Sequence, residues 1–132
     1  MARRKEQVLQ ESLTNQEEWD TFLAKPGLGV IDCFQSWCGP CKPVVGLFRR
    51  LKIDLSSDLL HFAKAECDSI DSLENYRQNC EPCFHFYGGG QMVAIVRGCN
   101  APVLEKTVRE QIKSEEKILE VANSFFLSNM YF

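Results

Sequence analysis

The sequence predicts an α/β fold in which a central mixed sheet, a parallel β-α-β core completed by an antiparallel hairpin, is flanked by helices. Two apolar runs, 28–34 and 59–67, have the length and composition of strands that are covered on both faces. Helical patterns alternate with these runs along the chain, which is typical of a parallel sheet with crossover helices. Two further strand patterns, 84–87 and 91–96, are separated by the glycines at 88–90, which predicts the hairpin.

The N-terminal part of the chain contains the first helix signal. A short candidate strand at 7–10 is followed by Thr14 and Glu17, which have the spacing of a helix capping box. The apolar side chains after them recur at helical intervals and are Trp19, Phe22 and Leu23. We expect this helix to end near 25–27, where a Lys-Pro-Gly sequence precedes the central strand 28–34.

The second helix is expected after Cys38, with Pro43 in its first turn, where a missing N–H costs little. Its inward side chains are Val44, Val45, Leu47, Phe48 and Leu51. The buried strand 59–67 then leads into a short helix at 68–79. A phosphate-binding loop is the alternative interpretation of the glycines at 88–90, but such a loop would need a following helix, and a strand follows instead. We therefore interpret these glycines as a turn.

The last helix begins at Pro102 with an amphipathic pattern. After the charged segment 113–117 the apolar content rises again over 118–132. This tail is too short to span a membrane and too aromatic to be well solvated, so we expect it to pack weakly on the domain or to self-associate. We divide the chain into a domain at 1–113 and a helical, apolar extension at 114–132.

Length and composition bound the class of protein. The 132 residues are 45% hydrophobic and 25% charged, as in a globular protein with one core rather than a disordered chain. The net charge of −3 argues against nucleic acid as a partner, because phosphate binding needs a basic face. The charged N-terminus lacks the apolar segment of a signal peptide, and seven cysteines, an odd number, favour a reducing compartment. We expect a cytoplasmic protein with no membrane partner.

The stretch 37–42, Trp-Cys-Gly-Pro-Cys-Lys, carries the chemistry. Cys38 and Cys41 can close a small-ring disulfide if a turn brings them together, and a turn that opens a helix favours a thiolate at the first cysteine. The second cysteine is then placed to attack a mixed disulfide and release the product. Gly39 lets a partner chain approach closely, and Pro40 fixes φ. We predict that Cys38 is the nucleophile and Cys41 the resolving thiol of a redox disulfide.

Asp32 is a carboxyl group inside an apolar strand, six residues before Cys38. Burial disfavours its ionised form and should raise its pKa towards neutrality, so that it could accept the proton of Cys41 through a water molecule. The alternative is a half-buried acid paired with Lys64. In either case we expect Lys64 to tune the charge of the site rather than to react.

Cys80 and Cys83 form a second C-x-x-C pair, which suggests a zinc site with Cys38 and Cys41. The first pair already has a redox explanation, so we expect no metal. The remaining thiols are interpreted as small core residues and are Cys33, Cys67 and Cys99. Both histidines, His61 and His85, lie in strand patterns and are interpreted as structural.

Taken together and in this order, the motifs resemble thioredoxin from about Val8 to Lys113. The stretch 37–42 matches the thioredoxin active site, and other positions match the buried acid, the lysine facing it, the cis-proline and the glycine after the last strand; these are Asp32, Lys64, Pro82 and Gly98. The resemblance implies a protein-disulfide reductase with no bound cofactor, reduced by NADPH through a thioredoxin reductase. It also implies a groove that pairs with an extended substrate peptide and is formed by Trp37, Gly39, Pro40, Glu81, Pro82 and Gly98.

A closer resemblance is to the thioredoxin domain that opens the nucleoside-diphosphate-kinase homologues of sperm and cilia, whose relatives include light chains of outer-arm dynein. It is carried by 38–45, 59–63 and 80–98. It implies a cytoplasmic or axonemal setting and an alternative role as a module that docks microtubule or axonemal proteins. Two features depart from the family pattern: Cys83 replaces the usual threonine, and Pro43 lies earlier than the family's mid-helix proline. No phosphotransfer motif is present in the sequence, so phosphoryl transfer is not predicted.

Overall fold

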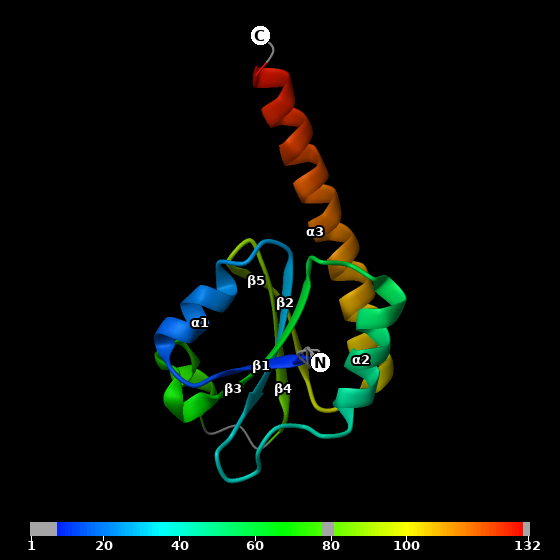
Figure 1. Ribbon diagram of the computed structural model, residues 1–132. Helices are drawn as coiled ribbons and strands as arrows, with labels where there is room; N and C mark the ends of the chain where they lie inside the picture. The colour runs from blue at the N-terminus through cyan, green and yellow to red at the C-terminus, as the bar shows by residue number, and fades with distance from the viewer. Residues whose placement is uncertain (1–7, 78–80, 131–132) are drawn as a thin grey trace, which may run out of the picture.

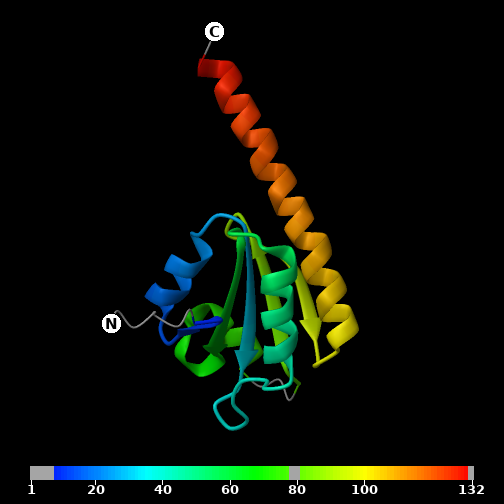
Figure 2. The same ribbon diagram turned by 45° about the vertical axis from the view of Figure 1, so that its right-hand side comes forward.

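The computed structural model describes residues 8–77 and 81–130, which fold into two layers of helices around one sheet (Figures 1 and 2). The elements, in chain order, are β1 (Gln10–Leu13), α1 (Gln16–Leu23), β2 (Leu28–Phe34), α2 (Val44–Leu55), β3 (Leu60–Glu66), the 3₁₀ helices η1 (Cys67–Ser69) and η2 (Asp71–Tyr76), β4 (Cys83–Gly88), β5 (Gln91–Arg97) and α3 (Ala101–Met130).

The sheet has the strand order β1-β3-β2-β4-β5, with β2 at its centre. Strands β1, β3 and β2 are parallel, whereas β4 pairs antiparallel to β2 and β5 antiparallel to β4. The predicted mixed sheet is therefore confirmed, with its parallel core and its terminal hairpin. The central position of β2 explains its continuous apolar sequence, because strands pair with it on both sides and helices cover both its faces.

Alternate side chains of β2 supply two separate cores. Val30 faces a core under α2 and α3 that includes Phe48, Phe62, Phe84, Phe86, Leu104, Val108 and Ile112. Ile31 faces a second core under α1 and the 3₁₀ helices that includes Trp19, Phe22, Ala63, Ile70 and Leu73. Figure 1 shows α1 on one side of the sheet and α2 and α3 on the other. The period of two along the strand thus divides the interior.

Two local predictions near the N-terminus are corrected. The first strand is Gln10–Leu13 rather than 7–10, where only residues from Val8 onward are described. The helix cap is shifted by one residue: the Asn15 side chain accepts a hydrogen bond from the Glu18 backbone N–H, and the Glu18 carboxylate accepts one from the Thr14 hydroxyl. Asn caps helices as well as Thr does, so the pattern allowed both registers.

Between β3 and β4, the single helix expected at 68–79 is two short 3₁₀ helices as far as Tyr76, and residues 78–80 lie outside the described part of the chain. The hairpin prediction is confirmed. Gly89 and Gly90 both have positive φ, 59° and 80°, which is the backbone of a tight two-residue hairpin turn and is favourable for glycine.

The last helix, α3, is one continuous element of 30 residues. Its first half packs on the sheet, and its last buried side chain is Glu115, which contacts Gly88 of the hairpin. Beyond it the helix projects from the domain (Figures 1 and 2), and its large apolar side chains are exposed at Ile118, Val121, Phe125, Phe126 and Leu127. No helix of the described residues is both long enough and apolar enough to cross a bilayer. The division of the chain at 113/114 stays a prediction.

Candidate active site

A cavity of about 370 Å³ lies at the carboxyl end of β2. It gathers most of the residues that the sequence assigned to the site, and its lining includes Asp32, Trp37, Cys38, Gly39, Pro40, Cys41, Glu81 and Pro82. Two residues assigned to the site do not line it. Lys64 lies on β3 as the register partner of Asp32, and Gly98 follows β5. The Trp37 side chain is 69% exposed and forms an apolar rim.

The loop between β2 and α2 has a defined irregular backbone. The backbone N–H groups of Cys38 and Gly39 both donate to the Gln35 carbonyl, at 3.1 and 3.0 Å. Gly39 has φ +71°, a value that glycine adopts without strain. The helix α2 begins only at Val44, so the expectation that a helix opens at Cys38 is wrong. The glycine conformation and the prolines around Cys41 keep this segment out of a regular helix.

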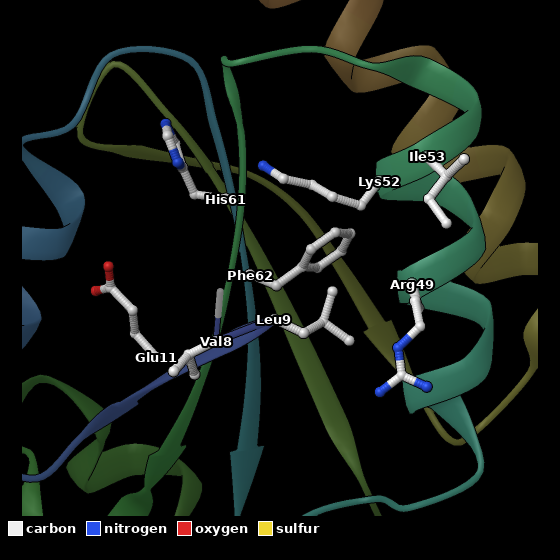
Figure 3. A pocket seen from close by; sticks show the side chains of 8 residues that line it. All are labelled: Val8, Leu9, Glu11, Arg49, Lys52, Ile53, His61 and Phe62. Carbon is white, nitrogen blue, oxygen red and sulfur yellow. The ribbon is translucent and has the colours of Figure 1, made fainter. Parts of the chain in front are cut away.

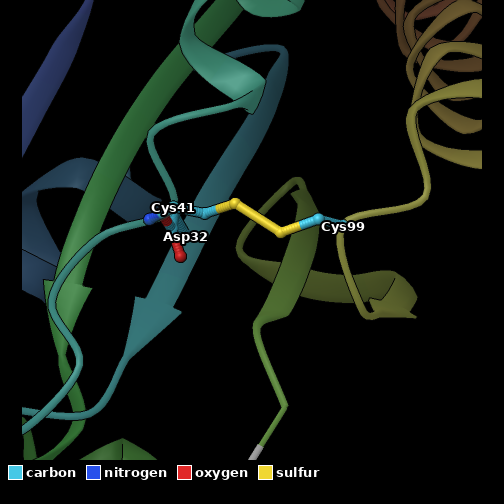
Figure 4. Close-up of a disulfide and its surroundings, with 3 residues drawn as sticks. All are labelled: Asp32, Cys41 and Cys99. Atoms are coloured by element: carbon cyan, nitrogen blue, oxygen red, sulfur yellow. A yellow bond between two sulfur atoms is a disulfide. The ribbon is translucent and has the colours of Figure 1, made fainter.

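The two thiols of the motif differ in exposure and in bonding. Cys38 is exposed and free, and its thiol donates to the Gln35 carbonyl at 3.5 Å. Cys41 is half-buried and forms a disulfide with Cys99, whose Cα lies 7.4 Å from its own (Figure 4). The predicted Cys38–Cys41 disulfide is thus not the one that the structure contains. Cys99 is also not the core residue that was expected, because it is exposed.

The position of Cys99 follows from its two neighbours in sequence. The Gly98 backbone N–H donates to the Pro82 carbonyl at 2.7 Å, and Gly98 has φ +85°, which turns the chain towards the cavity. On the other side, Asn100 caps α3, with its side-chain oxygen accepting from the Val103 N–H at 3.3 Å. The segment between β5 and α3 is therefore held beside the loop that contains Cys41. The separation of 58 residues hid this proximity from motif analysis, although a cysteine directly after the glycine that ends a strand was visible.

Asp32 is the buried acid of the site, with 1% of its surface exposed. Its Oδ2 accepts a hydrogen bond from the Cys41 backbone N–H at 2.8 Å, whereas its Oδ1 has no hydrogen-bond partner. Burial raises the pKa of Asp32 to about 6, against smaller opposing effects of the Cys41 N–H and the Lys64 charge. A carboxylate with this pKa, in contact with Cys41, is ionised at neutral pH and can accept a proton.

Pro82 lines the cavity as expected, but its peptide bond is not cis. No cis bond occurs in the described ranges 8–77 and 81–130, so the Glu81–Pro82 bond is trans. The trans isomer is the one that X–Pro bonds favour intrinsically, by about 0.5–1 kcal/mol. Cys80, which the zinc interpretation required, lies outside the described residues. Elsewhere in the described chain, no three His, Cys, Asp or Glu side chains gather as a metal site would need.

Three further thiols are buried, and of these only Cys33 is among the residues that line the cavity; they are Cys33, Cys67 and Cys83. Burial raises the pKa of each, for Cys67 to about 11. His85 on β4 is fully buried, neither of its ring nitrogens has a hydrogen-bond partner, and burial lowers its pKa to about 4. It packs edge-on against Tyr76 at 4.5 Å between ring centroids. At neutral pH these groups are uncharged and form part of the core.

A second cavity, of about 240 Å³, lies beside β1 and contains basic side chains (Figure 3). Two of its polar side chains are already bonded within the protein: Lys52 donates to the Leu60 carbonyl, and His61 contacts the Pro26 carbonyl at 3.1 Å. Glu11, at its rim, is paired with Lys25. The residues that line this cavity include no cysteine, so the cavity at the end of β2 is the candidate active site.

Comparison with known proteins agrees with the fold. Residues 10–110 match the family model of thioredoxin. The chain is 53% identical over 118 residues to human thioredoxin domain-containing protein 6, covering 89% of this chain and 36% of that protein. It is 54% identical over 119 residues to the thioredoxin domain-containing protein 3 homolog of Ciona intestinalis, covering 90% of this chain and 18% of that protein. It therefore spans well under half the length of these relatives.

Among solved structures, reduced Schistosoma mansoni thioredoxin superposes with a TM-score of 0.61 at 27% identity, covering 76% of this chain and 96% of that one.

Proposed function

This chain belongs to the thioredoxin family, and from that premise we propose that it is a protein-disulfide reductase that cycles Cys38 and Cys41 between dithiol and disulfide. One observation carries the proposal: an exposed free thiol, a half-buried second thiol and a buried carboxylate meet at a single cavity. An attacking group, a resolving group and a proton acceptor are what dithiol exchange requires.

The reaction begins with the dithiol form, in which Cys41 has been released from Cys99. The Cys38 thiolate attacks one sulfur of a substrate disulfide, a mixed disulfide forms, and the other substrate sulfur leaves as a thiolate. Cys41 then loses its proton to the Asp32 carboxylate, whose Oδ2 already contacts the Cys41 backbone. The Cys41 thiolate attacks Cys38 Sγ and releases the substrate in its fully reduced form. The substrate has then gained two electrons, and the protein is left with a Cys38–Cys41 disulfide.

Substrate contacts are proposed along the rim of the same cavity. The exposed Trp37 ring offers an apolar platform, and Gly39 leaves open space, because an added Cβ would meet no atom within 4 Å. Glu81 and Pro82 line the same cavity. Lys64 tunes the charge of Asp32 from the neighbouring strand. Gly98 acts through the backbone, by holding the Pro82 loop.

Reduction of insulin by the chain, supplied with a thioredoxin reductase and NADPH, tests this proposal. The protein is first reduced with dithiothreitol and desalted, so that every thiol starts free. Turnover is expected in the wild type and in Cys67→Ser, which makes the same chemical change at a buried thiol outside the cavity. It should be lost in Cys38→Ser and in Cys41→Ser. A wild type that does not turn over, or a Cys38→Ser variant that does, would reject the reductase.

A module that docks microtubule or axonemal proteins is the second candidate, in the setting of the sperm and ciliary kinase-linked subgroup. The exposed apolar side chains on the second half of α3 favour it, because surfaces of this kind mark interaction sites. We propose a cytoplasmic location for both candidates, and for the second a location at the cytoskeleton or cilium. If neither cysteine variant loses partner binding and the wild type reduces nothing, the docking role replaces the reductase.

A further inference from the structure

The disulfide in this structure involves only one thiol of the motif. Cys41, the proposed resolving thiol, is bonded to Cys99 (Figure 4), whereas Cys38 is exposed and free. The arrangement brings a third thiol, from a segment far away in sequence, to the sulfur that must react in the catalytic cycle. Cys41 therefore has two competing partners: Cys99 in this structure and Cys38 in the proposed cycle.

The fold presents Cys99 to Cys41 through anchored backbone. Its preceding residue, Gly98, is hydrogen-bonded to the wall of the cavity through the Pro82 carbonyl, and its following residue, Asn100, is the cap of α3. Both anchors are independent of the disulfide, so they keep Cys99 near Cys41 when the bond is open. A thiol held close to a disulfide reacts as if it were present at high local concentration.

We propose that Cys99 is a third redox residue of the site and that it exchanges with Cys38 for Cys41. The proposal rests on the proposed reductase function. After one turnover the Cys99 thiolate attacks Cys41 Sγ of the Cys38–Cys41 bond, a Cys41–Cys99 bond forms, and Cys38 leaves as a thiolate. One disulfide is exchanged for another: Cys99 gives up a proton, Cys38 gains one, and no external oxidant or reductant is needed.

The two oxidised forms differ in what they can do. In the Cys38–Cys41 form the nucleophile is blocked. In the Cys41–Cys99 form the nucleophile is free and exposed, but the thiol that would release its product is not available. Such a protein opens a substrate disulfide and retains the substrate until the Cys41–Cys99 bond is reduced. When reducing equivalents run short, Cys99 thus stops turnover and leaves the protein covalently bound to its substrate.

Disulfide mapping of the full chain tests the exchange without any activity assay. The protein is equilibrated in buffers of increasing oxidised to reduced dithiothreitol, quenched in acid, labelled with N-ethylmaleimide, and digested with trypsin. No Lys or Arg lies between Cys38 and Cys41, whereas Cys99 falls on a separate peptide after Arg97. Mass spectrometry therefore distinguishes a bond inside one peptide from a bond that joins two.

In the oxidised wild type we expect the two peptides joined through Cys41 and Cys99, with maleimide on Cys38. Cys99→Ser should lose that label, because Cys41 then closes on Cys38. Ala101→Ser, an exposed change that keeps all three thiols, should behave as the wild type. If Cys99 is labelled at every buffer ratio while Cys38 and Cys41 are bonded, or if Cys99→Ser keeps maleimide on Cys38, the proposal is overturned. A chain that forms the Cys41–Cys99 bond but reduces no insulin would reject the reductase and retain the exchange.

Discussion

Six of the seven cysteines form two sets at the same end of the sheet, and the sets differ in burial and in bonding. One set, the loop thiols, lies on irregular segments around the cavity: Cys38, Cys41 and Cys99. The other set, the buried thiols, lies on or beside strands and is inaccessible: Cys33, Cys67 and Cys83. Burial raises the pKa of every buried thiol, so these groups stay protonated and unreactive at neutral pH.

The comparison shows that the reactivity of a cysteine in this protein depends on its position in the fold. Cys33 and Asp32 are adjacent in sequence on β2, yet their side chains lie on opposite faces of the sheet. Asp32 is the link between the sets, because it bonds the backbone of Cys41 and also raises the pKa of Cys33 through its charge. Changes at Asp32 and at the groups around it should therefore separate the functional set from the structural one.

The largest expected effect is at the loop thiols themselves. In Cys41→Ser the nucleophile remains but nothing resolves its product, so stable mixed disulfides with substrate proteins should accumulate through Cys38. Cys38→Ser should trap none. The complexes can be isolated and located by mass spectrometry, with Cys67→Ser, kept reduced by thioredoxin reductase and NADPH, as the control that accumulates none. Capture by Cys38→Ser and none by Cys41→Ser would mean that the two roles are reversed.

Among the buried groups, His85→Phe should make the free energy of unfolding much less sensitive to acid. The folded pKa of His85, about 4, lies below the unfolded value of 6.5, so its contribution to stability is present above pH 6.5 and is lost as the pH falls through 4. This loss corresponds to about 3 kcal/mol. Urea unfolding of both proteins between pH 4 and 7 measures it. A stability difference between variant and wild type that does not change with pH would show that His85 has access to water.

At Asp32 the sign is opposite. Its folded pKa of about 6 exceeds the unfolded value of 3.8, so its stabilising contribution is present below about pH 4 and is lost as the pH rises through 6. Asp32→Asn should therefore raise the unfolding free energy at pH 7–8 by about 3 kcal/mol. The amide cannot accept the Cys41 proton, so turnover should slow in the same variant. Unchanged turnover from pH 6 to 8 would exclude Asp32 from the mechanism.

The smallest effect is expected from removing residues 118–132, which contribute to neither set of thiols. The last buried side chain of α3 is Glu115, so truncation after Lys117 leaves the packed part of the helix intact. We expect the unfolding free energy to change by no more than about 0.5 kcal/mol, as for surface changes, and solubility to improve. Thermal unfolding and sedimentation measure the two. A loss of several kcal/mol would show that the tail belongs to the core.

Much of this fold could be predicted because its signals are local. The continuous apolar sequence of 28–34 requires a strand that is covered on both faces, and the glycines at 88–90 permit a tight turn. The site could be predicted from the motif 37–42 and from Asp32. Both lie at or just after the end of β2, and residues this close in sequence also lie close in space. Local patterns that fit two registers, such as the cap at Thr14 or Asn15, gave errors of one residue.

The features that could not be predicted depend on contacts between distant segments. The late start of α2 at Val44 is set by the turn around Gly39, whose positive φ the sequence does not specify. The trans bond at Pro82 depends on a loop that is itself held by Gly98. Cys99 looked like a small core residue because its sequence pattern carries no sign that β5 ends beside Cys41, 58 residues earlier.

The course of α3 has a consequence for access to the molecule. The helix begins just after Cys99, at the end that carries the cavity, and its tip lies at the opposite pole (Figures 1 and 2). With a rise of 1.5 Å per residue, 30 residues separate its ends by about 45 Å. A protein bound to the exposed apolar side chains at 118–127 would therefore leave the mouth of the cavity uncovered. The two poles can be occupied together, and occupancy at one would be non-competitive with substrate at the other.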